Sequence, residues 1–455
     1  MNPAPPVTHA RIGKSYSVLL GTRIYSAMIE QAVVLCGGTG SRMTAVSAHP
    51  KCLIEVNGKS ILELQVASFT DFGVKEVLLL LGHGALEVID KISVLENKYN
   101  VKISHIVEHV PLGTGGALLN AHSLLQDSFY LAHGDIVMNS DLSGLAKAVA
   151  HDGFDIAMMY HPSSHPDDSD LLVIRDHARV GEIVTKPHPA FLGRGLGNAG
   201  LYSFSKRALN EERITFESNT CKMDLDRELL PRLLRSKKSI AAVRNLGFLK
   251  DCGTPERLDW ISKNWESVMK TPIRKPAIFF DRDGTLNKLR GFITDPEQID
   301  VFEDAPKVVK ELKNLNFWVI VITNQPVIAR GEVTVEGLDE IHGRIEREIL
   351  RGGGLIDDFF YCPHHPDSGF PNEVRELKIS CKCRKPEAGL IEKASAIYPI
   401  DIEKSWMIGD SWRDIELARR LGLRSIQIGE KVSVDGADFS AKSLLEALEI
   451  VRTRI

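Results

Sequence analysis

Long hydrophobic runs and cysteines are both scarce in this sequence, and neither sign of charge dominates. No stretch approaches the ~18 uninterrupted apolar residues of a membrane-spanning helix, and residues 1–28 contain only a broken apolar run, unlike a signal peptide. Seven cysteines in 455 residues are too few for a disulfide scaffold. The formal net charge of −4 excludes a general attraction to nucleic acid or to an anionic membrane. We therefore expect a cytoplasmic protein with neither kind of partner.

The remaining composition is that of an ordinary globular protein, 43 % hydrophobic and 25 % charged. Residues 1–28 lack periodicity, and we expect them to be an N-terminal extension. Short apolar runs then alternate with amphipathic stretches over residues 29–265, and the same alternation restarts at residue 277 and continues to 455. Residues 266–276 contain two prolines and no apolar period, so they are the expected linker. The pattern predicts an α/β fold in two tandem domains.

A glycine-rich segment follows the first apolar run, VVLC. Glycines let backbone amides approach a polyphosphate closely, and the nearby Arg42 and Lys51 could neutralise its charge. The sequence patterns of a P-loop kinase and of a GxGxxG dinucleotide fold are both absent. The structural alternative is a tight turn between a strand and a helix.

This loop and the motifs after it resemble the sugar-1-phosphate nucleotidyltransferases over about residues 29–260. The matching segments, in the order of the family, are 37–43 with Pro50-Lys51, PLGTGGAL at 111–118, GD at 134–135, TKP at 185–187, NAGLY at 198–202 and KDCGTPERL at 250–258. The resemblance implies that a sugar 1-phosphate attacks the α-phosphorus of a nucleoside triphosphate and releases pyrophosphate. It also implies a mixed sheet.

The same resemblance implies a role for each charged residue of these motifs. Asp135 and Asp251 are expected to hold Mg²⁺, Arg42 to steady the pyrophosphate, Lys51 to contact the reacting phosphates and Lys186 to bind the sugar phosphate. Arg42 and Lys51 are the expected catalytic residues. The other expected substrate-binding residues are Gly37, Gly38, Thr39, Gly40, Ser41, Gly113, Thr114, Gly115, Asn198 and Gly200.

The base of the nucleotide is predicted from Glu108, which lies three positions before Pro111. Members of the family place a base-contacting side chain there. An ionised carboxylate only accepts hydrogen bonds, and guanine offers two adjacent donors that uracil, thymine and adenine lack. We therefore predict GTP. An exposed loop glutamate with no contact to the base is the alternative.

A second site is predicted where the apolar run AIFF ends in Asp281 and Asp283, with Gly284 permitting the turn that brings them together. The pattern DxDGT resembles the haloacid dehalogenase superfamily. The resemblance implies that Asp281 is the nucleophile that forms an aspartyl phosphate, and that Asp283 protonates the leaving alcohol and then activates water. Two aspartates that merely cap a turn are the alternative.

The other motifs of that superfamily follow in order. Thr323 and Asn324 are expected to hydrogen-bond the phosphoryl group, and Lys385 to neutralise it. Asp414 is expected to support the metal site from behind its ligands. The expected Mg²⁺ ligands of this site are Asp281, Asp283 and Asp410.

Three cysteines and a histidine between residues 362 and 383 suit a closed, tetrahedral and therefore structural Zn²⁺ site. His365 competes for the histidine position, and cysteines unconnected with a metal are the alternative. The zinc would fix the loop that carries Lys385, two residues beyond the last cysteine. The expected ligands are Cys362, His364, Cys381 and Cys383.

With this zinc loop, residues 277–430 resemble the D-glycero-D-manno-heptose 1,7-bisphosphate phosphatases and, more distantly, the histidinol-phosphate phosphatases. The family commonly reads TNQSGIARG, but this chain has Pro326 and Val327 in place of Ser and Gly. We expect the change to stiffen a loop near the phosphate and to remove a hydroxyl, with a consequence for substrate geometry or rate. Arg330, which is retained, and Arg384 are expected to bind substrate, Arg330 at its distal phosphate.

Together the two resemblances predict two doubly wound, Rossmann-like domains and a bifunctional enzyme. One half would remove the 7-phosphate of a heptose bisphosphate, and the other would use GTP to convert the heptose 1-phosphate to GDP-heptose and pyrophosphate. One alternative is a transferase for another sugar 1-phosphate fused to a histidinol-phosphate-type phosphatase. Another is a non-catalytic nucleotide sensor, which the presence of all the expected carboxylates argues against. A homo-oligomer stays open.

Overall fold

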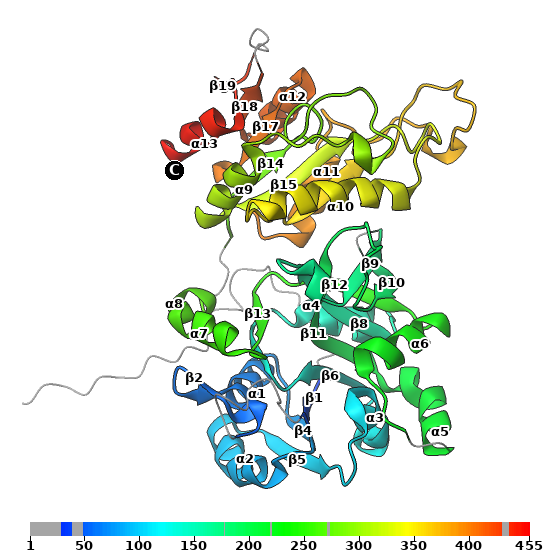
Figure 1. Cartoon of the computed structure of the whole chain (residues 1–455), viewed down its shortest axis with the longest axis vertical. Coiled ribbons are helices and arrows are strands. Elements are labelled where there is room, and N and C mark those ends of the chain that lie inside the picture. The colour runs from blue at the N-terminus through cyan, green and yellow to red at the C-terminus, as the bar shows by residue number, and fades with distance from the viewer. Residues whose placement is uncertain (1–28, 39–48, 177, 219–220, 271–273, 430–435) are drawn as a thin grey trace, which may run out of the picture. The chain divides into compact units, whose positions relative to one another are not determined.

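The structure is a computed structural model that describes residues 29–38, 49–176, 178–218, 221–270, 274–429 and 436–455. The expected N-terminal extension, most of the glycine loop and part of the expected linker lie outside these ranges. The described chain forms two compact units (Figure 1). The first takes in the described residues of the ranges 1–159, 177–179 and 199–270, and the second those of 160–176, 180–198 and 271–455.

The first sheet is mixed and has nine strands, in the order β5-β4-β1-β6-β11-β8-β12-β10-β9. Four neighbours run parallel: β5 (Lys102–Val107), β4 (Glu76–Leu81), β1 (Gln31–Cys36) and β6 (Ser128–His133). Next to them, β11 (Leu196–Ser205) runs antiparallel to β6. The remaining strands are β8 (Ile156–Pro162), β12 (Ile240–Arg244), β10 (Arg179–Val184) and β9 (Leu171–Arg175). The sheet is mixed, as the resemblance implied.

The central strands of this sheet are continuous apolar runs because they are covered on both faces. All six residues of β1 are buried, and helix α1 (Ile61–Asp71) contributes Leu62, Val66 and Phe69 to the same core. Helix α1 begins where the Ser60 hydroxyl accepts a hydrogen bond from the backbone N–H of Glu63. The other main helices of the first unit are α2 (Ala85–Tyr99), α3 (Gly113–Asn120), α5 (Asn210–Ser218), α6 (Leu230–Arg235) and α7 (Pro255–Lys263).

A two-stranded ribbon begins just beyond the carboxyl end of β6. Strand β7 (Ile136–Asn139) pairs antiparallel with β13 (Phe248–Asp251), so that Asp251 lies opposite Ile136. The pairing continues past the strands, because the N–H of Cys252 donates to the carbonyl of Asp135 over 2.7 Å. This pairing brings Asp135 and Asp251 to the same end of the ribbon, although they are 116 positions apart in the sequence.

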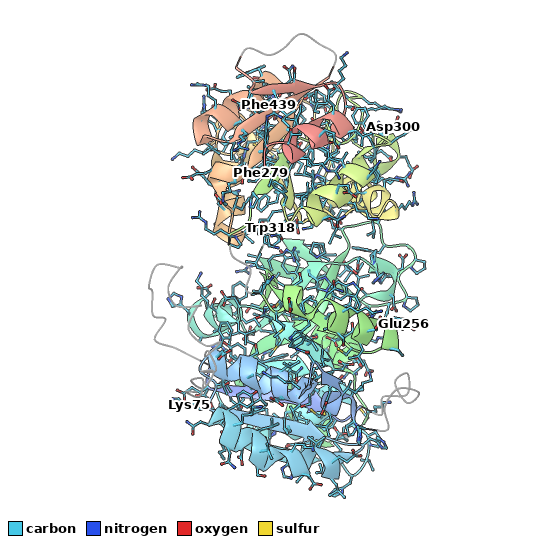
Figure 2. All side chains as sticks on the ribbon, turned by 90° about the vertical axis from the view of Figure 1, so that its left-hand side faces the viewer. Lys75, Glu256, Phe279, Asp300, Trp318 and Phe439 are labelled. Atoms are coloured by element: carbon cyan, nitrogen blue, oxygen red, sulfur yellow. The ribbon has the colours of Figure 1, made fainter. Side chains whose placement is uncertain are left out.

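The second sheet is fully parallel, with six strands in the order β16-β15-β14-β17-β18-β19. Its strands are β14 (Ala277–Phe280), β15 (Trp318–Asn324), β16 (Asp358–Cys362), β17 (Trp406–Gly409), β18 (Arg424–Ile428) and β19 (Phe439–Ala441). Strand β14 is central, and Phe279 on it is fully buried (Figure 2). The chain order reverses between β14 and its neighbours β15 and β17, and ligands of such sheets bind at the carboxyl ends of the strands at this point.

Within the described residues, five helices accompany this sheet: α9 (Ala305–Asn314), α10 (Val335–Arg351), α11 (Gly389–Ile397), α12 (Trp412–Leu421) and α13 (Leu444–Arg452). Helix α10 buries Leu338, Ile341, Ile345 and Ile349, the spacing of one helical face. Helix α12 begins in a capping box, where the Asp414 carboxylate accepts hydrogen bonds from the N–H and the hydroxyl of Ser411. No helix among the described residues is long and apolar enough to cross a membrane.

Candidate active sites

A pocket opens at the carboxyl ends of β1 and β6 in the first unit. Glycine is required at its floor, since a Cβ on Gly134 would lie 2.6 Å from the Leu35 carbonyl oxygen. The expected site residues that line this pocket are Gly37, Gly38, Lys51, Glu108, Gly113, Thr114 and Asp135. The expected residues Thr39, Gly40, Ser41 and Arg42 lie outside the described residues.

The two expected metal carboxylates of the transferase are both close to Cys252, which follows Asp251 in the chain and donates its N–H to the Asp135 carbonyl. Its burial, followed by the charges of Asp135 and Asp251, raises the pKa of the Cys252 thiol to about 12. Each carboxylate has a cationic partner: Lys51 Nζ lies 3.1 Å from Asp135, and Arg257 is paired with Asp251. Two hard carboxylates balanced by cations fit a site that could hold Mg²⁺. Asp135 lines the pocket, whereas Asp251 does not.

The PLGTGG loop is fixed to its neighbours by hydrogen bonds. The N–H of Gly115 donates to the carbonyl of Met223 over 3.0 Å, and the Thr114 hydroxyl accepts from the N–H of Leu225 over 2.8 Å. Gly113 has a φ of 73°, and a Cβ there would lie 2.4 Å from the Met223 oxygen. The Thr114 hydroxyl and the Gly115 N–H thus fix the segment that follows residue 221; Thr114 still lines the pocket, whereas Gly115 does not.

Glu108 lines the same pocket and is half-buried. Its Oε2 accepts a hydrogen bond from the N–H of Leu112 over 3.2 Å. Burial raises the pKa of the Glu108 carboxyl, because the charged form loses solvation. The side chain is therefore held by the loop and still borders the cavity.

Sequence reasoning missed His133, which also lines this pocket. Its Nε2 lies 3.0 Å from Asp226 Oδ2, and the Tyr202 hydroxyl donates to the other oxygen of Asp226. Burial opposes the charged ring, but Asp226 outweighs burial and raises the pKa of His133 to about 9. Gly200, an expected substrate-binding residue, has a φ of 70°, and a Cβ there would lie 2.9 Å from the His133 ring. The only available signal was a histidine two positions before Asp135.

Two other expected transferase residues lie in the second unit and do not line the pocket. Lys186 Nζ donates to the carbonyl oxygen of Asp168 over 2.7 Å and lies 3.1 Å from its carboxylate. The N–H of Asn198 donates to the carbonyl of Asp170 over 2.9 Å.

At the carboxyl end of β14, a buried lysine joins two carboxylates. Lys385 Nζ lies 2.6 Å from Asp281 and 2.7 Å from Asp414. Burial and the charge of Asp414 raise the pKa of Asp281 to about 7, and burial also raises the pKa of Asp410 to about 6. Three carboxylates, Asp281, Asp410 and Asp414, offer oxygens within 4.8 Å of one another. Such oxygens fit Mg²⁺, which would favour the ionised carboxylates.

Asp283 is not in this group, where the structure has Asp414 instead. The Asp283 carboxylate accepts two hydrogen bonds from Arg282, at 3.0 and 2.7 Å, one from Asn287 at 3.0 Å and one from Gln325 at 3.0 Å. Burial opposes its charge, but Arg282 and the two amides outweigh it and lower the pKa of Asp283. Gly284 allows the turn here, because its φ is 85° and a Cβ would lie 2.1 Å from Asp410 Oδ2.

Strand β15 ends in the two residues expected to bind the phosphoryl group. Asn324 is tied to the lysine loop, since its Oδ1 accepts from the N–H of Lys385 over 2.9 Å and its Nδ2 donates to the Lys385 carbonyl over 3.2 Å. The Thr323 hydroxyl accepts from Gln325 Nε2 over 2.8 Å. Gln325 was not among the site residues expected from the sequence.

The structure brings together all four expected zinc ligands, with ligand atoms within 4.8 Å of one another. The sulfurs of Cys362, Cys381 and Cys383 are 3.3 to 3.5 Å apart, and His364 Nδ1 lies 3.1 Å from the Cys383 sulfur. Hydrogen bonding from Cys362 lowers the pKa of Cys383 to about 5. Three thiols and one imidazole at this spacing fit a tetrahedral Zn²⁺ site. His365 is not in the group; its ring nitrogen accepts from the N–H of Asp367.

Cationic side chains lie near residues 362–383, the segment that carries the four expected zinc ligands. The Arg330 guanidinium lies 3.9 Å from the centre of the Phe292 ring and 4.5 Å from that of Phe370. Lys378, with a side chain only 7 % exposed, lies 4.7 Å from the Phe370 centre and 3.8 Å from Glu373. We call Arg330, Lys378 and Arg384 the cation cluster. Burial and then Arg384, with smaller effects of Arg330 and Lys378, lower the pKa of His365.

The departure from TNQSGIARG lies next to the cation cluster. Val327 is 1 % exposed and packs in the core of the second sheet, where a glycine would leave space. The Pro326 carbonyl accepts a hydrogen bond from the N–H of Arg330 over 3.0 Å. The substituted pair therefore supports the turn that carries Arg330.

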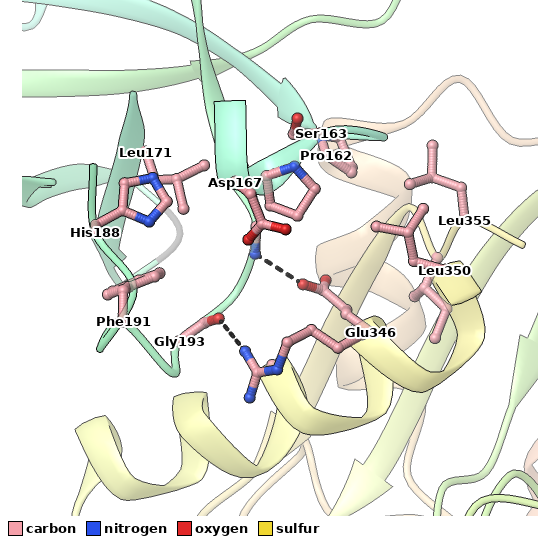
Figure 3. A pocket seen from close by; sticks show the side chains of 15 residues that line it. Pro162, Ser163, Asp167, Leu171, His188, Phe191, Gly193, Glu346, Leu350 and Leu355 are labelled. Atoms are coloured by element: carbon pink, nitrogen blue, oxygen red, sulfur yellow. Dashed lines mark hydrogen bonds between the residues drawn. The ribbon is translucent and has the colours of Figure 1, made fainter. Parts of the chain in front are cut away.

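A further pocket of the second unit is mostly apolar (Figure 3). Its polar groups already pair with each other: Glu346 accepts from the N–H of Gly195 over 3.0 Å, and Arg347 donates to the Gly193 carbonyl over 3.2 Å. Close by, Arg194 is buried between Glu346 and Asp358, at 2.8 and 2.7 Å. We assign this pocket no chemistry.

Comparison with known families agrees with two catalytic halves. Residues 31–267, more than half of the chain, match the family described as "Nucleotidyl transferase", and residues 382–438 match the HAD-hydrolase-like family. The chain belongs to the nucleotidyl transferase family and carries a HAD-type phosphatase region after the transferase region.

Individual relatives cover one half or the other. The D-glycero-beta-D-manno-heptose-1,7-bisphosphate 7-phosphatase of Yersinia pestis is 32 % identical over 185 residues, which is 39 % of this chain and 96 % of the relative. The protein of the same name from Escherichia coli K12 is 34 % identical over 31 % of this chain and 73 % of its own. The crystal structure of HddC from Yersinia pseudotuberculosis is 26 % identical, covers 52 % of this chain and 100 % of HddC, and has a TM-score of 0.43.

Proposed function

We propose that the C-terminal half removes the 7-phosphate of D-glycero-D-manno-heptose 1,7-bisphosphate and that the N-terminal half joins GMP from GTP to the resulting heptose 1-phosphate. The products would be GDP-heptose and pyrophosphate. We further propose that residues 29–265 form the transferase domain and residues 277–455 the phosphatase domain. The proposal has three supports: the phosphatase relatives, the carboxylate and lysine geometry at β14, and the cation cluster.

The first step uses Asp281 as the nucleophile. Its carboxylate lies 2.6 Å from Lys385, which would neutralise the incoming phosphate, while Thr323 and Asn324 would donate hydrogen bonds to the phosphoryl oxygens. In its protonated form Asp283 would give a proton to the leaving oxygen, and the resulting carboxylate would later take one from water. Asp281, Asp410 and Asp414 would hold Mg²⁺, which when bound neutralises charge on the transferred phosphoryl group.

The cation cluster supports a bisphosphate as substrate. Lys378 has no hydrogen-bond partner for its buried Nζ among the described residues, and the same holds for Nε of Arg330. Half-buried cations with buried donor atoms that lack a hydrogen bond favour a second anionic group on the substrate. Histidinol phosphate carries one phosphate and an ammonium group, which this cluster would repel. The cluster is therefore the observation that favours a sugar bisphosphate over that alternative.

In the transferase half, the chemistry is positioning and charge neutralisation. Lys51 would contact the reacting phosphates, and Asp135 with Asp251 would hold Mg²⁺, which supplies positive charge to the triphosphate. Glu108 borders the pocket with one oxygen bound to Leu112, so the other could accept from the N1–H and amino groups of guanine. This supports GTP as the donor.

The test is a phosphate-release screen over heptose 1,7-bisphosphate, fructose 1,6-bisphosphate and histidinol phosphate, followed by addition of each nucleoside triphosphate with Mg²⁺. We expect fastest release from the heptose bisphosphate and a sugar nucleotide with GTP. Faster release from histidinol phosphate would overturn the proposed sugar, and equal turnover with UTP or CTP would overturn the proposed base. Arg330→Met removes one cation of the cation cluster, and we expect it to raise KM for heptose 1,7-bisphosphate ten-fold or more relative to the wild-type chain.

A further inference from the structure

Gln325 lies between three parts of the phosphatase site. It follows Thr323 and Asn324 at the end of β15 and is 2 % exposed. Its backbone N–H donates to the carbonyl of Cys362 over 2.8 Å, and Cys362 is one of the four expected zinc ligands. Its side-chain amide donates to Thr323 and to Asp283. One buried side chain thus contacts both the phosphate-binding strand end and the proposed acid.

The bond to Asp283 differs in origin from the other bonds that this carboxylate accepts. In the described part of the chain, the remaining donors are Arg282 and Asn287, which belong to the same short loop as Asp283. Gln325 is 42 positions away and directly follows the neighbouring strand, β15. The donors within the loop orient the carboxylate relative to its own loop, whereas Gln325 orients it relative to the strand that would hold the phosphoryl group.

The bond to Thr323 has a direction. The amide is the donor and the Thr323 oxygen the acceptor, at 2.8 Å. A hydroxyl that accepts from one side is left to donate its own proton elsewhere. Because the Thr323 hydroxyl keeps its own proton when the amide is removed, we expect loss of the amide to act mainly through Asp283.

We infer that Gln325 is a positioning residue of the phosphatase, which holds Asp283 where it can protonate the leaving oxygen. The inference rests on the proposed aspartyl-phosphate chemistry. The backbone N–H of Gln325 is hydrogen-bonded to the carbonyl of Cys362, one of the expected zinc ligands. A displacement of the loop that carries these ligands would therefore also move the Gln325 amide and its bond to Asp283. Gln325 does not itself touch the reacting atoms.

The leaving group provides the test. A 4-nitrophenyl phosphate releases a phenolate that needs no proton, whereas a sugar phosphate releases an alkoxide that does. If Gln325 acts through Asp283, Gln325→Met should lower kcat at least 30-fold on heptose 1,7-bisphosphate and on fructose 1,6-bisphosphate, but less than 3-fold on 4-nitrophenyl phosphate. KM should change less than 3-fold on all of them.

Two variants calibrate this measurement. Asp283→Asn removes the acid and should show the same dependence on the leaving group. Thr323→Val removes a phosphate contact and should lower kcat about equally on aryl and alkyl substrates. Transferase activity and the melting temperature of each variant report whether it folds. If Gln325→Met does not fold, Gln325→Asn replaces it in the same test, because its amide is withdrawn by one methylene.

Losses of equal size on aryl and alkyl substrates, or no loss on either, would overturn the inference. Failure of the proposed substrate is distinguishable from this outcome, because the wild-type chain would then cleave 4-nitrophenyl phosphate and fructose 1,6-bisphosphate but not the heptose bisphosphate. Failure of the phosphatase chemistry itself would appear as no wild-type hydrolysis of any of the three.

Discussion

Gly284→Ala is the substitution whose effect on the phosphatase can best be worked out from the structure. The new Cβ would lie 2.1 Å from Asp410 Oδ2, about 1 Å short of ordinary contact, so Asp410 would have to move by about that distance. A displacement of 1 Å in catalytic machinery can lower the rate about 100-fold. The φ of 85° adds strain of about 1–2 kcal/mol for any residue with a side chain.

Gly291→Ala is the matched control. Gly291 has a φ of 76°, but a Cβ there would meet no heavy atom within 4 Å. Gly291→Ala should lose about 2–8 °C in melting temperature, on the scale of about 2–4 °C per kcal/mol, and Gly284→Ala at least as much because of its additional overlap with Asp410. Only Gly284→Ala should also lose about 100-fold in kcat/KM for phosphate release, while both keep transferase activity. Equal activity of the two variants would refute the reasoning that Gly284 makes room for Asp410.

Two other predictions concern the zinc loop and the nucleotide base. Cys381→Ser should reduce the amount of bound zinc, measured by elemental analysis of the purified protein. Because the same loop carries Lys385, the variant should also lose phosphatase activity at least 10-fold while it keeps transferase activity. Full zinc content in the variant would contradict the ligand set. Because burial raises the pKa of Glu108, its carboxyl should protonate at a higher pH than an ordinary glutamate, so KM for GTP should rise as the pH falls from 7 to 5. Glu108→Gln should have a high KM for GTP at both pH values, and a steep pH dependence in that variant would assign the effect to another group.

The α/β architecture and the grouping of three cysteines with a histidine could be predicted from the sequence because each depends on local information. Apolar runs that end in polar residues mark the strands, as at β14 and β15. The expected zinc ligands are distinctive residue types close together in the chain, and the structure brings together Cys362, His364, Cys381 and Cys383. The domain boundaries and the roles of individual residues stay predictions.

The other features depend on contacts between residues distant in the chain. Asp283 and Asp414 are both near Asp281, but only Asp414 belongs to the carboxylate group that could hold a metal ion. Hydrogen bonds from Arg282, Asn287 and Gln325 hold the Asp283 carboxylate elsewhere, and the spacing of residues in the sequence does not show these bonds. The Thr114 hydroxyl accepts a hydrogen bond from the N–H of Leu225, 111 positions later, and the motif of Thr114 does not show this partner. His133 gains its partner Asp226 in the same way.

The central claim is that two separate groups of carboxylates perform two separate reactions. Asp281→Asn and Asp135→Asn should be assayed side by side for phosphate release from heptose 1,7-bisphosphate and for sugar-nucleotide formation from supplied heptose 1-phosphate and GTP. We predict that Asp281→Asn abolishes only phosphate release and that Asp135→Asn abolishes only sugar-nucleotide formation. Loss of both reactions in either variant, with the fold intact, would contradict the claim.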